Sequence, residues 1–325
     1  MIKTASLAGV GLPIVLLSLA PAVASAQEKF PSKPIEMIIP VAPGGGVDTS
    51  HRLIAELAEP LLGTKIVVIN KPGSSGALGT SAIIQARPDG YTIGGIWNAP
   101  LTMTPHILSV PYGPNDYIAV SQTTSAPTIV CAKKAFPASN GKELIELFRQ
   151  NPRKYTYGND GIGNVVQLAV ERILIKFDAK ARGVPFNGAA ETLKAFLGDH
   201  IDLYAGSIAP MQPYLKDGSA KCLIVTSVEK NDAAPEATSL SELGIPDEAT
   251  SNWRGIIAPK HVPADRVTIL EKAFRAAAQS DRFRAVIAAR GEEARSASSA
   301  EMQQQLDAEY RAMGTIINAI GLAKK

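Results

Sequence analysis

Short runs of β-branched and other apolar residues alternate with amphipathic segments from residue 35 onward. Apolar runs bounded by turn residues are typical of strands, and apolar residues at helical spacing predict helices. The first part of the pattern predicts strands at 35–40, 65–70 and 91–97, with helices at 53–61 and 78–86 between them. This order favours a mostly parallel sheet with helices on both faces.

A second set of alternating segments follows. It predicts strands at 128–133, 155–157, 182–185, 201–205 and 222–226, and helices at 142–150, 164–177 and 189–197. A polar, proline-containing stretch then precedes a strand at 253–258 and helices at 264–279, 281–289 and 299–319. The pattern therefore predicts two α/β units. It permits the chain to return to the first unit but does not establish the return.

The N-terminus has the features of a cleavable signal peptide. Lys3 precedes a short apolar run that Pro13 interrupts, and the small residues Ala24 and Ala26 follow it. We expect residues 1–26 to be removed by cleavage after Ala26, which makes the protein an exported one. The alternative, a membrane anchor, is disfavoured because the run is short and broken by proline.

Removal of residues 1–26 leaves 299 residues, with 32 basic and 30 acidic side chains spread along the chain. This length suits two domains. The dispersed, nearly balanced charge indicates neither a nucleic-acid partner nor a membrane surface. Cys131 and Cys222 both lie in apolar runs. They could form one disulfide, but we expect two buried thiols, since sequence alone cannot place them within bridging distance.

A glycine turn lies between the first predicted strand and its helix. It contains Gly44, Gly45 and Gly46, and the surrounding loop covers residues 41–47. Ligands bind at the carboxyl ends of strands in α/β proteins, and the first N–H groups of a helix attract anions. The turn therefore predicts a carboxylate site. A nucleotide site is disfavoured, because the spacing is not Gly-x-Gly-x-x-Gly and no Gly-Lys-Ser/Thr follows; a turn without a ligand is the other alternative.

A second glycine loop, residues 158–164, has the same context before a long predicted helix. If the two loops face each other, two helix N-termini converge on one anion. Asp160 would repel a bound carboxylate unless it points away or meets a cationic group; we expect it to bond N–H groups of its own turn. A third loop, residues 70–76, could line the same edge, with Lys71 adding positive potential.

Catalytic chemistry finds little support in the sequence. The four histidines have no metal-ligand spacing, and no Gly-x-Ser-x-Gly motif is present. We expect no enzymatic activity, no metal and no cofactor. His51, close to the first glycine turn, is expected to be a partly exposed helix residue. Trp97 and Trp253 could wall a pocket, but isolated aromatic residues are more often part of a core.

Several motifs occur in an order that resembles one known family. They lie at residues 30–35, 40–48, 70–73, 88–91, 151–152, 157–158, 184–188 and 253–255. Together they resemble the tripartite tricarboxylate transporter substrate-binding proteins, also called Bug receptors, over nearly the whole exported chain. The chain departs from the family at Val41, Gln167 and Asp160, where the size, hydrogen bonding and charge of the pocket would change.

The resemblance implies an α/β fold of the two-lobed periplasmic binding protein type, a type II-like flytrap in which each lobe is a mostly parallel sheet flanked by helices. Lobe 1 would comprise residues 27–126 and 251–325, and lobe 2 residues 127–250. The implied ligand-binding residues are Val41, Gly44, Gly45, Gly46, Val47, Asn98, Gly158, Asp160, Gly161, Ile162, Gly163, Asn164 and Tyr204.

The function implied is that of a monomeric receptor in the periplasm. It would bind a small organic carboxylate between its lobes and deliver it to a membrane permease of a tripartite tricarboxylate transporter. Two alternatives stay open: a ligand-sensing partner of a membrane sensor kinase, and an exported enzyme that acts on a carboxylate with His51 or Asp160 as acid or base.

Overall fold

The computed structural model describes Met1 and residues 29–186 and 188–324, so the predicted signal peptide and its cleavage site lie outside the described residues. Residues up to Phe30 form a unit separate from Pro31–Lys325, and the fold belongs to the second unit. No helix in the described ranges is both long and apolar enough to cross a membrane.

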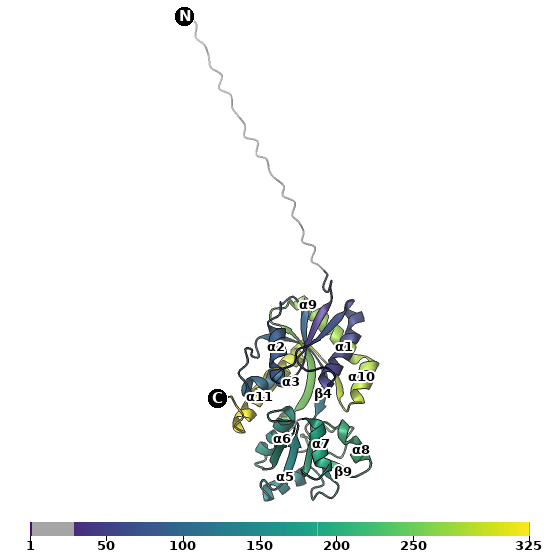
Figure 1. Ribbon diagram of the computed structural model, residues 1–325, viewed down its shortest axis with the longest axis vertical. Coiled ribbons are helices and arrows are strands. Elements are labelled where there is room, and N and C mark those ends of the chain that lie inside the picture. The colour runs from purple at the N-terminus through teal and green to yellow at the C-terminus, as the bar shows by residue number, and fades with distance from the viewer. Residues whose placement is uncertain (2–28, 187, 325) are drawn as a thin grey trace. The chain divides into compact units, whose positions relative to one another are not determined.

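The first sheet has six strands in the order β11-β4-β10-β3-β1-β2. Figure 1 labels β4 of this sheet and β9 of the second sheet. Its strands are β1 (Ile35–Ile39), β2 (Ile66–Asn70), β3 (Thr92–Trp97), β4 (Tyr117–Pro127), β10 (Ser251–Pro259) and β11 (Glu293–Ala297). β1 pairs in parallel with β2 and β3. β10 is antiparallel to both β3 and β4, and β11 is antiparallel to β4.

The second sheet has five strands in the order β7-β6-β8-β5-β9. Its strands are β5 (Ile129–Lys133), β6 (Thr156–Asn159), β7 (Arg182–Pro185), β8 (Leu203–Gly206) and β9 (Ala220–Val225). β6 is parallel to β7 and β8, whereas β5 is antiparallel to β8 and β9. The chain enters this sheet after β4 and returns to the first sheet through β10, as the resemblance implied.

Both sheets are mixed, so the expectation of mostly parallel sheets is wrong in its detail. In the first sheet, the long strands β4 and β10 lead out of the sheet and back into it, and they run antiparallel to each other from the Ser251–Pro127 pair to the Pro259–Tyr117 pair. In the second sheet, β5 follows β4 and is antiparallel to both β8 and β9. The strand membership of the two sheets supports the predicted division into lobes, which stays a prediction.

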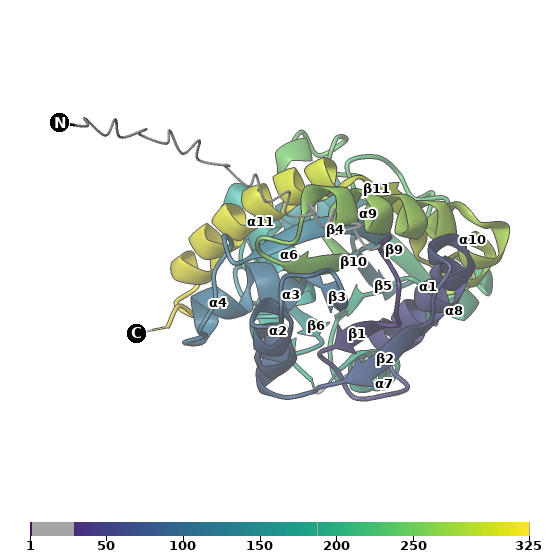
Figure 2. The ribbon, with the colours of Figure 1, turned by 90° about the horizontal axis from the view of Figure 1, so that it is seen from above.

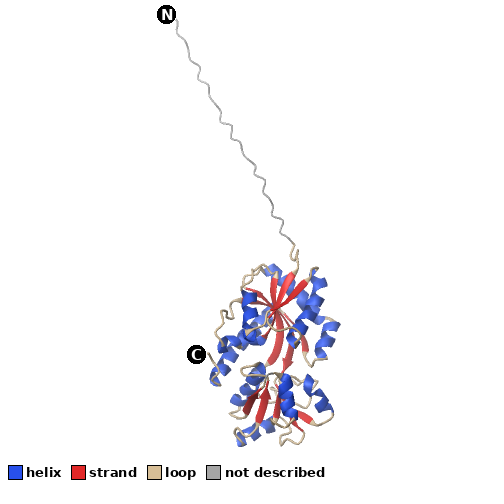
Figure 3. Cartoon of the chain, in the orientation of Figure 1, coloured by secondary structure: helices blue, strands red, loops and turns tan. Residues whose placement is uncertain are grey.

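Helices cover the faces of both sheets (Figure 3). They are α1 (Gly46–Leu62), α2 (Ala77–Ile84), α3 (Asn98–Thr102), α4 (Thr104–Ile107), α5 (Gly141–Gln150), α6 (Val165–Lys176), α7 (Ala189–Leu197), α8 (Gln212–Lys216), α9 (Ala264–Gln279), α10 (Asp281–Ala288) and α11 (Ser299–Ala319), with short 3-10 turns at Ser74–Gly76, Ala209–Met211 and Pro246–Glu248. The buried face of α1 carries Ile54, Ala58 and Leu62, whereas Leu61 is 54% exposed. Gly63 ends the helix in the left-handed conformation that glycine tolerates best.

The C-terminal helix α11 packs against both sheets' cores. It begins with a capping box, in which Ser298 and Glu301 exchange hydrogen bonds between side chain and backbone. Met302 and Leu306 join the apolar core of the first sheet, whereas Met313 and Ile317 join that of the second. Figure 2 shows α11 along β4, and its contacts extend to α3 and α6. One amphipathic helix therefore links the two sheets beside the crossing strands.

Strand β4 was not expected from the sequence. Its second half consists of Gln122, Thr123, Thr124 and Ser125, which carry no apolar alternation, yet all four are buried. They are covered because β10 and β11 pair with β4 on its two edges and α11 packs on it. Tertiary contacts thus override a polar sequence. β11, α3, α4 and α8 were not expected either. Residues 293–297, which form β11, carry no apolar run, and helices of four or five residues are too short to show a helical period.

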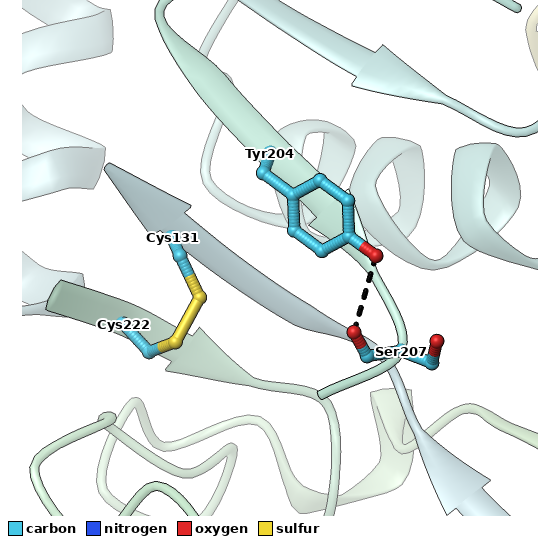
Figure 4. Close-up of a disulfide and its surroundings, with 4 residues drawn as sticks. All are labelled: Cys131, Tyr204, Ser207 and Cys222. Atoms are coloured by element: carbon cyan, nitrogen blue, oxygen red, sulfur yellow. Dashed lines mark hydrogen bonds between the residues drawn. A yellow bond between two sulfur atoms is a disulfide. The ribbon is translucent and has the colours of Figure 1, made fainter. Parts of the chain in front are cut away.

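Cys131 and Cys222 form a disulfide, which corrects the expectation of two thiols (Figure 4). Cys131 lies in β5 and Cys222 in β9, and the antiparallel register places the two residues directly opposite each other. The sequence could not reveal this pairing because 91 positions separate them. The disulfide joins the edge strand β9 to its neighbour β5 in the second sheet.

We expect the disulfide to stabilise the second sheet mainly by restricting the unfolded chain. Replacing both Cys131 and Cys222 by Ala should lower the free energy of unfolding by about 2–5 kcal/mol, as measured by urea denaturation. A reductant should lower the stability of the wild type and leave that of the variant unchanged. Equal sensitivity of the two proteins to the reductant would contradict the assignment.

Candidate functional site

The first glycine loop connects β1 to α1 and is exposed at Gly44, Gly45 and Gly46. Gly44 has a φ of +93°, a conformation that side-chain-bearing residues rarely adopt. In the described structure α1 has no side-chain hydrogen bond capping its N-terminus. The N–H groups of Gly46 and Val47 have no partner within the helix and sit at the positive end of its dipole. They are therefore available to an anion.

Asp48, in the first turn of α1, holds this loop in place. Its Oδ2 accepts the N–H of Gly44 at 2.9 Å, and its carboxylate also accepts Arg52 Nε at 3.0 Å. The N–H of Gly44 is thus used internally, and its role as a ligand donor stays a prediction. Burial alone would raise the pKa of Asp48, but the hydrogen bonds from Arg52, Gly44 and Asn70 hold the pKa below its ordinary value.

The third loop is tied to the first through Asn70. Asn70 Nδ2 donates to Asp48 Oδ1 at 2.8 Å and to the carbonyl oxygen of Val41 at 2.9 Å. Arg52 Nη2 donates in turn to Asn70 Oδ1. Sequence analysis placed this loop at the same edge but did not find the role of Asn70. Val41 takes part through its backbone, and its side chain is half-buried.

His51 is fully buried, so the expectation of a partly exposed residue is wrong. Its Nδ1 lies 2.8 Å from the carbonyl oxygen of Val47 and its Nε2 lies 3.2 Å from that of Gly255 in β10. The ring packs on β3, where a Cβ at Gly95 would come within 2.7 Å of it. Burial lowers the pKa of His51 to about 4. His51 is therefore a neutral core residue that joins α1 to the sheet.

The second glycine loop satisfies most of its own donors. The N–H of Gly161 donates to Asn159 Oδ1 at 3.1 Å, and that of Gly163 donates to Gln167 Oε1 at 2.7 Å. Asn164 caps α6 by accepting the N–H of Gln167. Gln167, one of the departures from the family, is thus a structural partner of the loop. The Nδ2 of Asn159 is buried and has no acceptor among the described residues.

Asp160 bonds a neighbouring helix and not its own turn, which corrects the expectation. Its Oδ1 accepts the hydroxyl of Thr192 in α7 at 2.8 Å. Burial raises the pKa of Asp160, and the hydrogen bond from Thr192 only partly opposes this. Within the described ranges no cation forms an ion pair with Asp160. The carboxylate is therefore an acceptor with spare capacity.

Two other predicted site residues are buried and have structural partners. Asn98 Nδ2 donates to the carbonyl oxygen of Ser251 and to Glu309 Oε1, both at 2.9 Å, while its Oδ1 is buried without a donor in the described chain. The hydroxyl of Tyr204 donates to the carbonyl oxygen of Ser207 at 3.1 Å (Figure 4). Burial, followed by the charge of nearby Asp160, raises the pKa of Tyr204.

The second loop lies close to helix α4 and to the residues that follow α11. A Cβ at Gly163 would lie 2.6 Å from Cδ1 of Ile107 in α4 and 3.9 Å from Cδ1 of Leu322. Gly158 is buried in β6, and the Ile162 side chain is 69% exposed. No hydrogen bond or ion pair joins residues 41–47 to residues 158–164 in the part of the chain that the structure describes. The predicted clamp of two facing loops stays a prediction.

Arg254, in β10, was not among the predicted site residues, although it lies within the family-like motif at 253–255. Its side chain is 8% exposed, and its Nη1 forms an ion pair with Glu292. Its Nη2 lies 3.5 Å from the position that a Cβ on Gly46 would occupy. A cation therefore lies beside the first glycine loop. Because 208 positions separate Gly46 from Arg254, no local pattern places the two side by side.

A cavity of about 570 Å³ lies elsewhere, where β4 ends and β10 begins. Its walls include Ser125, Arg172, Ser251 and Glu309, and none of the predicted ligand-binding residues. Arg172 is engaged by Glu248, Thr250 and the carbonyl oxygen of Asp247. Glu309 accepts hydrogen bonds from Trp253, Asn98 and Thr102, which makes Trp253 a core residue. The polar groups here serve the fold.

Two mixed sheets flanked by helices are the architecture of periplasmic binding proteins. A solved solute-binding protein from Polaromonas, described as a TctC protein without ligand, aligns with a TM-score of 0.83 at 26% identity over 89% of this chain and 99% of that one. An R. palustris protein determined with adipate aligns with a TM-score of 0.72 at 25% identity over 90% of this chain and 99% of that one.

Residues 51–322 match the model of the tripartite tricarboxylate transporter family receptor. A UPF0065 protein encoded in the gbd 5′ region of Cupriavidus necator is 30% identical over 98% of this chain and 97% of its own length. The chain therefore belongs to the tripartite tricarboxylate transporter receptor family, which confirms the resemblance found in the sequence.

The burial of His51 predicts a pH-dependent loss of stability. The unfolded chain takes up a proton at this ring near pH 6.5, whereas the folded protein does so only near its pKa of about 4. The unfolding free energy should therefore fall by roughly 3 kcal/mol as the pH drops through this window. Urea denaturation of the wild type and of a His51→Gln variant measures the effect.

In the His51→Gln variant, the unfolding free energy should depend much less on pH between pH 6.5 and pH 4 than it does in the wild type. His200→Gln is the matched control, because His200 is exposed. A slope that survives in His51→Gln, or one that disappears in the control, would show that another group is responsible.

Proposed function

We propose that this protein is a periplasmic solute receptor that binds a small organic carboxylate between two α/β lobes and delivers it to a membrane permease. The observation that carries the proposal is the exposed glycine turn before the uncapped helix α1, with the Arg254 guanidinium beside it. Backbone N–H groups, a helix dipole and a guanidinium act together on an anion.

The family assignment supports the same function. The relative determined with adipate is a protein that holds a dicarboxylate. The two glycine loops would belong to lobe 1, residues 27–126 and 251–325, and to lobe 2, residues 127–250. Capture of the ligand requires closure of the lobes and no covalent chemistry, so donor placement and pocket shape set specificity. The predicted signal peptide would place the receptor in the periplasm.

A ligand screen tests the proposal. Protein refolded from urea, to remove any bound acid, is heated with mono-, di- and tricarboxylates and with the corresponding amides. A bound acid at a hundredfold excess over its Kd should raise the unfolding free energy by about 2.7 kcal/mol. The amides should stabilise less, because they carry no charge for Arg254 and α1. A folded protein that none of the acids stabilises would refute the proposed function.

Asp160 is expected to favour ligands that carry a hydrogen-bond donor besides the carboxylate. Malate and succinate differ by one hydroxyl, so their ratio of affinities isolates such a contact. We expect the wild type to bind malate more tightly than succinate. In Asp160→Ala the ratio of the two affinities should fall by about 10- to 100-fold, as expected for loss of a hydrogen bond to a charged group. Isothermal titration calorimetry gives both constants.

The matched control is Thr192→Val, which removes the internal hydrogen bond of Asp160 and leaves its carboxylate in place. This variant should keep or increase the preference for malate. If Asp160→Ala and the wild type discriminate equally between the two acids, Asp160 has no role in ligand selection.

A further inference from the structure

Arg254 uses only part of its guanidinium within the protein. Nη1 donates to Glu292 and, at 3.4 Å, to the hydroxyl of Thr124. Nε is buried and has no acceptor among the described residues, and no acceptor there is paired with Nη2. One edge of the guanidinium, formed by Nε and Nη2, is therefore unpaired.

That free edge lies beside the first turn of α1. Nη2 is the atom that approaches Gly46, 3.5 Å from where its Cβ would be. α1 has 17 residues, and the N–H groups at its start have no partner within the helix. Arg254 and α1 come from segments far apart in the sequence, so the fold itself brings these donors together.

The electrostatics of this arrangement favour an anion. A cation beside the positive end of a helix dipole is unfavourable by itself, and so is a buried donor without an acceptor. Glu292 balances the charge, since its side chain is only 11% exposed, but it contacts Nη1 alone. A second anion at the free edge would satisfy the guanidinium and the helix N-terminus together.

We propose that Arg254 is the residue that anchors and selects the ligand's carboxylate. The carboxylate binds side-on to Nε and Nη2 and accepts hydrogen bonds from the N–H groups of Gly46 and Val47, while Glu292 orients the guanidinium through Nη1. This inference rests on the proposed function and adds to it the group that distinguishes a carboxylate from a neutral ligand.

A carboxylate matches this edge of the guanidinium in shape as well as in charge. Its two oxygens match two parallel N–H donors of a guanidinium edge, a geometry that the single ammonium of lysine cannot reproduce. Arg254→Lys keeps the charge and loses the two-pronged contact. Arg254→Gln combined with Glu292→Gln removes both charges, so the variant has no unpaired buried carboxylate.

The experiment uses calorimetry on the refolded protein without its predicted signal peptide. It compares the affinities of three acids, adipate, succinate and benzoate, with those of the corresponding amides, adipamide, succinamide and benzamide. The wild type should bind at least one acid far better than its amide. The double variant should bind that acid about 30-fold more weakly or worse, as expected for loss of a buried charged partner. Its acid-to-amide ratio should fall towards one, a change that general loosening of the fold would not produce.

Thermal melting first establishes that each variant is folded. If the double variant is folded and keeps the acid affinity and the acid-to-amide ratio of the wild type, the inference is wrong and the proposed function stands. If the double variant does not fold, the Arg254→Lys variant is used in its place. An acid affinity and an acid-to-amide ratio equal to those of the wild type would overturn the side-on contact. Loss of both would support it. If the wild type binds no acid at all, the proposed function fails, and the inference fails with it.

Discussion

The carboxylate of Asp48 is the interaction on which the geometry of the first glycine loop depends. It accepts the N–H of Gly44, the guanidinium of Arg52 and the amide of Asn70, and so joins the loop, the helix and the neighbouring strand end. A negative charge in the first turn of a helix is also favourable to the helix dipole. Because Asp48 accepts the N–H of Gly44, the ligand contacts that we propose are those of Gly46 and Val47, further along the loop.

The two glycine loops look alike in sequence but differ in their hydrogen bonding. The first loop is held by the carboxylate of Asp48, which accepts the N–H of Gly44, and its helix α1 has no side-chain cap in the described structure. The second uses the side chains of Asn159, Asn164 and Gln167 to occupy its own donors. An anion therefore finds free donors at the first loop, whereas the second offers the acceptor Asp160. Under the proposed function, the two loops would contact opposite ends of the ligand.

The connection between the sheets is polar as well as apolar. Buried Glu309 of α11 accepts hydrogen bonds from Trp253 in β10 and from Asn98 and Thr102 in α3. Burial raises the pKa of Glu309, and these three donors oppose that effect. This network, together with the apolar contacts of α11 to both cores, holds α11 and α3 against β10, the strand that also carries Arg254.

The sequence by itself determined most of the strands and helices, though not the long strand β4, together with the glycine loops at the ends of β1 and β6 and, through the order of its motifs, the family. These features are local, because hydrophobic period and turn chemistry act over a few residues. Tertiary structure alone decided the burial of His51, the Cys131–Cys222 disulfide and the position of Arg254 beside Gly46. Each depends on the antiparallel pairing of strands far apart in the chain, and no local pattern encodes which distant residues such pairing places opposite each other.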